Sequence, residues 1–277
     1  MYKIFLTCRN RLAITTKCIT AIQKFSRLPH QIYVYDNLTN HRIQEHFMYF
    51  SLLYEKGIIT QYTVNTKEST FNAFSKAVAC NQFGLNHEQD PNKDKVDFLV
   101  FLDNDCIIVQ EGWDQILKNA WDDINRLGMT NIKVIGHLPG GIMKKREIPT
   151  KIAGYQAMVG THGGSGFWVV KNNFFREVGY LNIKELIGID KKHDQNYWRK
   201  LQQVSQNKDY ILGLKLIFVV HTGSIAGSVC NTLTKNKTKP DKHELIKFDH
   251  AEKEIDNLTF DQFYNKIKDN SKMIGDW

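Results

Sequence analysis

The strongest chemical signal in the sequence is a pair of carboxylates at the end of an apolar segment. Residues 97–102 are typical of a buried strand, and Asp103, Asn104 and Asp105 follow them directly. In an extended chain the side chains of Asp103 and Asp105 point the same way, so they can share one cation. Hard divalent cations prefer such oxygen ligands, and they neutralise a diphosphate. The pattern indicates a metal site, although a solvated Asp-rich turn would have a similar sequence.

Three further residues later in the chain are candidates for the same chemistry. His221 ends the apolar run 216–220, where it is either a metal ligand or a histidine of the core. Asp190 precedes a predicted helix at 194–206, and Asp194 begins it. A general base must take the proton of an attacking hydroxyl, and either carboxylate is suited to that role. We prefer Asp194 because it begins the helix, although there it could serve only as an N-cap.

Alternating strands and helices must position these groups. In the first half of the chain, apolar runs alternate with segments whose apolar residues recur at helical spacing. Such alternation predicts a mostly parallel sheet with helices on both faces, and ligands bind such sheets at the carboxyl ends of the strands. The expected strands are residues 2–7, 31–35, 58–64 and 97–102, and the clearest expected helices are residues 72–83 and 113–124.

The second half of the chain is less regular. We expect strands at 132–135 and 167–170, and either one long strand or a strand pair at 210–220. Glycine, proline and polar residues predict loops between these elements. The expected loops are residues 139–150, a glycine-rich turn at 162–166 and a basic loop at 231–242, with a final helical segment at 243–267.

Together these motifs resemble glycosyltransferase family 2, whose members have the GT-A fold. The resemblance implies a Rossmann-like, mostly parallel sheet with a small mixed sheet beyond the metal site. The resemblance spans roughly residues 3–228 and rests on the order of several short motifs. The chain departs from the family at Cys8-Arg9, where a proline-containing sequence is usual, and at Asp194 to Arg199, which is one residue shorter than usual. The matching segments are residues 4–11 as the first strand and nucleotide-binding turn, Tyr35-Asp36-Asn37, Asp103-Asn104-Asp105 as the DxD motif, residues 163–166, Asp190 to Arg199, and Val220-His221.

The resemblance implies roles for individual residues. Asp36 would accept a hydrogen bond from uracil N3–H, which implies a UDP-sugar donor, although Asp36 could instead cap a helix. The glycine-rich turn would let the backbone approach the sugar, with Trp168 offering an apolar face. An imidazole ligand favours Mn²⁺ over Mg²⁺. The implied donor-binding residues are Thr7, Arg9, Asp36, Lys76, Asp103, Asn104 and Gly164; the implied metal ligands are Asp103, Asp105 and His221; and the implied base is Asp194 or Asp190.

The charge of the chain is consistent with a phosphate-bearing ligand. The net charge is +8, and residues 230–277 contain equal numbers of basic and acidic residues, so the excess belongs to residues 1–229. A solvated basic surface explains this excess as well as attraction to phosphates does. The acceptor stays open, and an anionic one, nucleic acid or a phosphate-containing polymer, is compatible with the charge.

No apolar run is long enough to span a membrane, and the N-terminus begins with a strand-like segment instead of a signal peptide. The five cysteines form no CxxC pair, which argues against structural zinc. We therefore expect a cytoplasmic protein. Its expected organisation is a GT-A catalytic domain at 1–229, with a nucleotide-binding half at 1–110 and an acceptor and metal half at 111–229, followed by a basic loop and helical tail at 230–277.

The sequence thus predicts a metal-dependent, inverting glycosyltransferase that uses a UDP-sugar and a hydroxyl acceptor. Inversion is implied by the family resemblance alone. Two other classes of function stay open. A nucleotide-sugar or nucleic-acid binding module would need neither Asp194 nor His221. A nucleotidyltransferase shares the fold and uses paired carboxylates, but it usually has a glycine-rich, basic loop after its first strand, which residues 7–11 lack.

Overall fold

The computed structural model describes residues 1–37, 42–65, 72–136, 146–161, 166–181, 200–206, 208–222 and 242–272. Within these ranges the elements are, in chain order, β1 (Tyr2–Cys8), α1 (Leu12–Phe25), β2 (His30–Asn37), α2 (Ile43–Glu55), β3 (Gln61–Asn65), α3 (Asn72–Gln89), the 3₁₀ turn η1 (Lys93–Lys95), β4 (Phe98–Asp103), β5 (Cys106–Ile108), α4 (Trp113–Arg126), β6 (Val134–Gly136), β7 (Arg146–Ile152), β8 (Tyr155–Gly160), β9 (Phe167–Lys171), α5 (Phe174–Val178), β10 (Ile211–Leu214), β11 (Val219–His221), α9 (Lys242–Asp256) and α10 (Phe260–Lys272).

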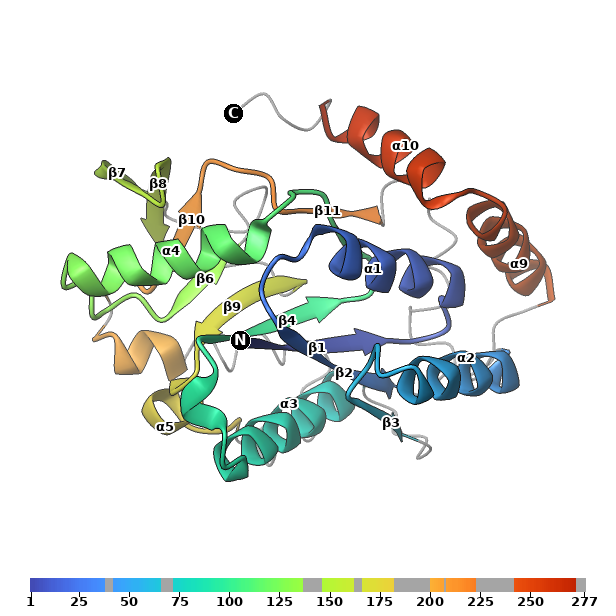
Figure 1. Cartoon of the computed structure of the whole chain (residues 1–277), viewed down its shortest axis with the longest axis horizontal. Helices are drawn as coiled ribbons and strands as arrows, with labels where there is room; N and C mark the ends of the chain where they lie inside the picture. The colour runs from blue at the N-terminus through green and yellow to red at the C-terminus, as the bar shows by residue number, and fades with distance from the viewer. Residues whose placement is uncertain are drawn as a thin grey trace.

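A nine-stranded sheet forms the centre of the molecule, in the order β3-β2-β1-β4-β9-β6-β10-β8-β7 (Figure 1). The four strands β1 to β4 pair with one another in parallel, whereas β9 is antiparallel to both β4 and β6. β1 is buried at every residue and β4 at every residue but its last. Such continuous burial is typical of parallel strands covered on both faces. The expected sheet is confirmed.

Helices cover both faces of this sheet (Figure 1). On one face, α1 and α4 contribute the side chains of Ile14, Cys18, Trp113 and Leu117 to the larger of two hydrophobic cores. On the other face, α3 and α5 contribute Phe83, Phe174 and Phe175, among others, to the second core. Because successive side chains of a strand point to opposite faces, each central strand supplies both cores.

A second, small sheet lies beside the carboxyl end of β4. It consists of β5 and β11, which pair antiparallel so that His221 lies opposite Cys106. The expected second sheet is therefore present as an antiparallel ribbon. Of the two alternatives expected at 210–220, the structure has two strands, and they lie in different sheets: β10 joins the large sheet beside β6, while β11 pairs with β5.

The expected loop at 139–150 is wrong for its last five residues. Residues 146–150 belong to β7, which pairs antiparallel with β8 at the end of the large sheet. β7 is mostly exposed, and its sequence REIPTKI combines charges with a proline. Charged residues and proline are typical of edge strands, where they discourage further pairing. Those same residue types are typical of loops, which explains the error.

The C-terminal helical extension is present as two helices, α9 and α10, with a break at residues 257–259. Both helices lie beside α1 (Figure 1). Phe263 and Ile267 of α10 are buried in the larger core, and the rings of Phe260 and Tyr264 contact Phe25 of α1. The extension therefore packs against the sheet-bearing body.

None of the helices in the described ranges is both long enough and apolar enough to cross a membrane. The division of the chain at residue 229 stays a prediction.

Candidate functional site

The turn after β4 lies at the carboxyl ends of the parallel strands. Thr7 of β1 and Asp103 of β4 are register partners, and the Thr7 hydroxyl donates a hydrogen bond of 2.5 Å to Oδ1 of Asp103. The backbone N–H of Asn104 donates to the carbonyl of Thr7 at 3.0 Å. The N–H of Asp103 donates to the carbonyl of Gly166 at 2.9 Å. Two segments that are distant in sequence, one around Thr7 and one around Gly166, thus hold this turn in place.

Asn104 points into the protein. Its side-chain amide donates a hydrogen bond of 2.7 Å to the hydroxyl of Thr15 in α1, and that hydroxyl donates in turn to the carbonyl of Arg11. Asn104 is buried, with 6% of its surface exposed. The structure therefore places this predicted donor-binding side chain between the turn and α1, where it anchors the turn.

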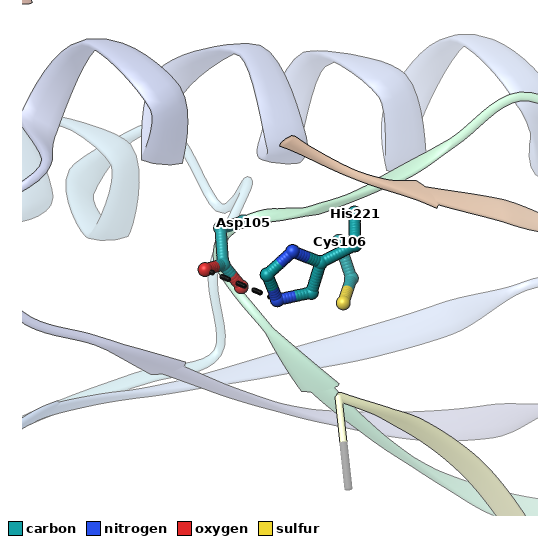
Figure 2. Close-up of side chains that lie close together, drawn as sticks. All are labelled: Asp105, Cys106 and His221. Atoms are coloured by element: carbon teal, nitrogen blue, oxygen red, sulfur yellow. Dashed lines mark ion pairs between the residues drawn. The ribbon is translucent and has the colours of Figure 1, made fainter. Parts of the chain in front are cut away.

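Asp105, Cys106 and His221 form a cluster at the small sheet (Figure 2). Nε2 of His221 lies 3.4 Å from Oδ2 of Asp105, and one potential ligand atom from each of the three residues lies within 4.8 Å of the others. Thr222 fixes this junction because its N–H and its hydroxyl both donate to the carbonyl of Asp105. The structure therefore brings the predicted ligands Asp105 and His221 together.

The cluster suits a divalent cation. A carboxylate oxygen, an imidazole nitrogen and a thiol sulfur converge, and imidazole with carboxylate is a donor set that suits Mn²⁺ as well as Zn²⁺. The His221 side chain is 59% exposed, whereas that of Asp105 is 13% exposed, so a cation can approach from the histidine side. Cys106 was not a predicted ligand. Its spacing directly after Asp105 was visible in the sequence, but its proximity to His221 depends on the β5–β11 register.

Arg11 is the second residue that the sequence did not identify as part of the site. Its guanidinium donates a hydrogen bond of 2.6 Å to Oδ2 of Asp105, the same oxygen that faces His221. Both side chains of this ion pair are largely buried. Buried charges are usually paired, but Arg11 follows Arg9 and Asn10 in the sequence, so no local pattern predicted its burial or its carboxylate partner.

Gly166 lies where the backbone of β9 approaches the cluster closely. A Cβ atom at this position would lie 2.6 Å from Sγ of Cys106 and 4.0 Å from Oδ2 of Asp103. Contacts below 3.0 Å require a neighbour to move, so a glycine is needed to keep Cys106 in its observed position.

Asp36 and Arg9 lie near the ends of β1 and β2. Asp36 is 1% exposed, accepts a hydrogen bond of 3.2 Å from the Tyr62 hydroxyl and lies 3.7 Å from Nδ1 of His46. Burial and the charge of Asp36 raise the pKa of Tyr62 well above its ordinary value. Burial lowers the pKa of Arg9, and the charge of Asp36 opposes this shift. The carboxylate that was predicted to accept a hydrogen bond from uracil thus accepts one from Tyr62 in this structure.

Several predicted residues lie outside the described part of the chain. These are Gly164, Asp190, Asp194 and the side chain of Lys76, whose backbone belongs to α3. The expected apolar platform at Trp168 is wrong. Trp168 is 6% exposed, and its ring stacks on Phe101 at 4.0 Å, in the core on the α3 side of the sheet. Its position on β9 directs its side chain to that face.

Two solved structures share this architecture. S. aureus TarS 1–349 is 13% identical in sequence, with a TM-score of 0.50, and the match covers 90% of this chain and 71% of that chain. GalNAc-T7 with UDP, GalNAc and Mn²⁺ is 12% identical, with a TM-score of 0.51, and the match covers 99% of this chain and 57% of that chain. The match to a longer TarS chain covers 43% of it. No protein-family model and no curated protein matches the chain.

Both of these proteins are built on the GT-A fold. Their identities to this chain are low, so the comparison concerns architecture. In this chain that architecture consists of a large, partly parallel sheet between helical layers and a small second sheet beside the carboxyl end of β4. The chain has the GT-A fold.

Proposed function

We propose that this chain is a metal-dependent glycosyltransferase that moves a sugar from a UDP-sugar to a hydroxyl acceptor with inversion at the sugar carbon. The observation that supports it best is the pairing of Asp105 with His221 at 3.4 Å, at the carboxyl ends of the parallel strands of a GT-A fold. The presence of UDP and Mn²⁺ in the GalNAc-T7 structure supports the same choice of ligands.

Asp105 and His221 would hold the cation, preferably Mn²⁺, with Asp103 close to it. A divalent cation supplies positive charge that stabilises a departing diphosphate. The chain prepares this site in advance, because Thr7 orients Asp103 and Arg11 orients Asp105. Such preorganised groups need little rearrangement during the reaction.

The remaining roles are those that the family resemblance implies for residues outside the Asp105–His221 cluster. Asp36 accepts a hydrogen bond from the uracil edge, and Arg9, Lys76 and Gly164 line the donor pocket. Asp194, or Asp190 in its place, removes the proton of the acceptor hydroxyl as that oxygen attacks the sugar carbon. The acceptor is a hydroxyl of a glycan, a cell-wall polymer, a protein or a modified DNA base.

Slow hydrolysis of the donor tests this function without knowledge of the acceptor. The protein is incubated with Mn²⁺ and a panel of UDP-sugars, and released UDP is measured. We expect UDP release from at least one donor, its loss in EDTA, its recovery with added Mn²⁺, and no release by an Asp105→Ala variant under any of these conditions. Full activity in EDTA would exclude the metal-dependent reaction. UDP binding without release or transfer would instead support the non-catalytic binding module.

A further inference from the structure

The N-terminus of α1 lies directly beside the metal-binding cluster. Arg11 is the N-cap residue of α1, but its side chain caps no backbone amide of that helix. Its guanidinium instead reaches Asp105, so the usual polar cap of a helix is missing here. The first amides of a helix have no partner within the helix, and burial without another acceptor is costly.

The C-terminal extension supplies the missing cap. Oε2 of Glu252, in α9, accepts a hydrogen bond of 2.8 Å from the backbone N–H of Ala13, which is 239 residues away in sequence. Glu252 is 2% exposed and Ala13 is 4% exposed. Figure 1 shows α9 running beside α1. Two further contacts hold this arrangement, a hydrogen bond of 2.6 Å from Lys17 to the carbonyl of Leu258 and an ion pair between Lys24 and Asp261.

Charged groups at the starts of α1 and α2 also act on the carboxylate of Glu252. A carboxylate is favoured at a helix N-terminus by the helix dipole. Arg11 from the start of α1 and Arg42 from the start of α2 favour the ionised form, whereas Asp256 on the same helix opposes it. Burial is the largest effect, and it raises the pKa of Glu252 to about 7. Within the described residues, Oε1 of Glu252 has no hydrogen-bond partner. A buried carboxylate with one unpartnered oxygen destabilises the fold, so the presence of Glu252 at this position needs an explanation.

We infer that Glu252 is a positioning residue of the metal and donor site: it fixes the first turn of α1 and thereby holds Arg11 against Asp105. In this proposal Glu252 contacts neither the metal ion nor the nucleotide-sugar. Its effect passes through the Ala13 amide to the N-cap residue, and from the Arg11 guanidinium to the carboxylate. The C-terminal extension is then part of the site's construction. The predicted effect on nucleotide binding rests on the proposed function, whereas the effect on the Arg11–Asp105 pair does not.

A double-mutant cycle measures that pair directly. Arg11→Met, Asp105→Asn and the combined variant are compared by urea unfolding, which yields the coupling between the two side chains. The cycle is repeated in a Glu252→Met background, which keeps the volume but removes the acceptor, and in a Glu252→Gln background, which keeps an acceptor. We expect strong coupling in the parent and in Glu252→Gln, and most of it lost in Glu252→Met. Equal coupling in all three backgrounds would overturn the inference.

Hydrogen exchange and ligand binding complete the test. In Glu252→Met the amides at the start of α1 should exchange several-fold faster, and the affinity for UDP with Mn²⁺ should fall about tenfold because the turn is no longer preorganised. Glu252→Gln should behave like the parent. Glu254→Ala, at an exposed position of the same helix, is the matched control and should change neither measurement.

The outcomes separate the two proposals. If the parent protein does not bind UDP with Mn²⁺ but the coupling still depends on Glu252, the proposed function fails and the positioning role stands. If the parent binds the nucleotide and Glu252→Met binds it equally well with unchanged coupling, Glu252 only caps α1 and the positioning role is wrong.

Discussion

Two side chains, those of Arg11 and His221, approach the same oxygen of Asp105, Oδ2. Arg11 donates to it at 2.6 Å, and Nε2 of His221 lies 3.4 Å from it. A divalent cation bound by Asp105 and His221 must share this carboxylate with the guanidinium. Arg11 can therefore keep the carboxylate oriented before the cation arrives, since buried ion pairs are most useful where they fix a geometry.

The general base can be separated from a helix cap by paired substitutions. Asp194→Asn keeps a capping oxygen but cannot take a proton at neutral pH. It should fold normally, bind UDP normally and transfer sugar about 10²- to 10⁴-fold more slowly, as measured by UDP release with acceptor present. Asp190→Asn is the matched comparison. A nearly unchanged rate in Asp194→Asn with an inactive Asp190→Asn would assign the base to Asp190, and activity in both would remove this segment from catalysis.

The nucleotide preference tests Asp36. A carboxylate that accepts from uracil N3–H should make UDP bind more tightly than GDP, because guanine presents different donors and acceptors there. Calorimetry with both nucleotides measures the preference. Tyr62→Phe is a useful control, since it removes the hydroxyl that now bonds to Asp36 and leaves the carboxylate in place. Equal affinities, or a preference for GDP, would remove Asp36 from the donor pocket.

At the scale of elements, the site depends on how closely strands and helices approach one another. Gly166, the residue before β9, contacts the turn after β4, and β11 brings His221 opposite Cys106. The N-cap residue of α1, Arg11, contacts Asp105, and α9 supports α1 through Glu252. Small changes at these junctions should therefore affect ligand binding as well as stability.

Gly166→Ala tests the closest of these approaches. Its Cβ would lie 2.6 Å from Sγ of Cys106, so the thiol or the strand must move. We expect a loss of about 1–3 kcal/mol in the free energy of unfolding, measured with urea, together with weaker Mn²⁺ binding. Cys106→Ala in the same background removes the clashing atom and should restore part of the stability. Additive effects of the two substitutions would show that this contact is not the cause.

Glu252 should make the stability of the protein depend on pH. Its pKa in the folded protein is raised from 4.5 to about 7, mainly by burial. The folded state therefore binds the proton more tightly, so the stability from this group is fully present below pH 4.5 and is lost as pH rises through about 7. The loss amounts to about 3 kcal/mol at most. Urea unfolding at several pH values measures it.

Glu252→Gln has no proton to lose, so its stability relative to the parent should rise between pH 5 and pH 8, the range around this pKa. Glu254→Gln, at an exposed site on the same helix, should follow the parent at each pH. Parallel curves for Glu252→Gln and the parent would show that the carboxylate titrates as it does in the unfolded chain.

At the scale of the whole molecule, the large sheet and the C-terminal extension both contribute to the same site. The parallel strands carry Thr7 and Asp103, and the extension supports the helix that carries Arg11. A ligand that contacts Asp105 and its neighbours should therefore stabilise both the large sheet and the packing of the C-terminal extension against unfolding.

Metal and nucleotide together should raise the melting temperature. A ligand at about 100 times its Kd adds about 2.7 kcal/mol, which for a domain near this size corresponds to a rise of about 5–10 °C. Thermal unfolding with UDP and Mn²⁺ measures this rise. EDTA should remove most of it, and Asp105→Ala should show little of it. An equal rise with UDP in EDTA would indicate a nucleotide site that does not use the metal.

The alternation of strands and helices and the position of the acidic turn at the end of β4 could be predicted from the sequence. Those features follow from local periodicity, because a buried parallel strand needs a continuous apolar run and a helix needs apolar residues at helical spacing. The same reasoning placed His221 at a strand end. It failed for β7, whose residues suit an exposed edge and a loop equally well.

The side chains that contact one another across the site could not be predicted from the sequence. The contacts of Arg11 with Asp105, of Asn104 with Thr15 and of Glu252 with Ala13 join residues that are 94, 89 and 239 positions apart. Hydrophobic patterning specifies which face of an element is buried, but it does not specify which polar group of another element lies at the same point of that face. Those pairings follow from sheet order, strand register and the packing of α9 on α1, and for that reason they appear only in the folded chain.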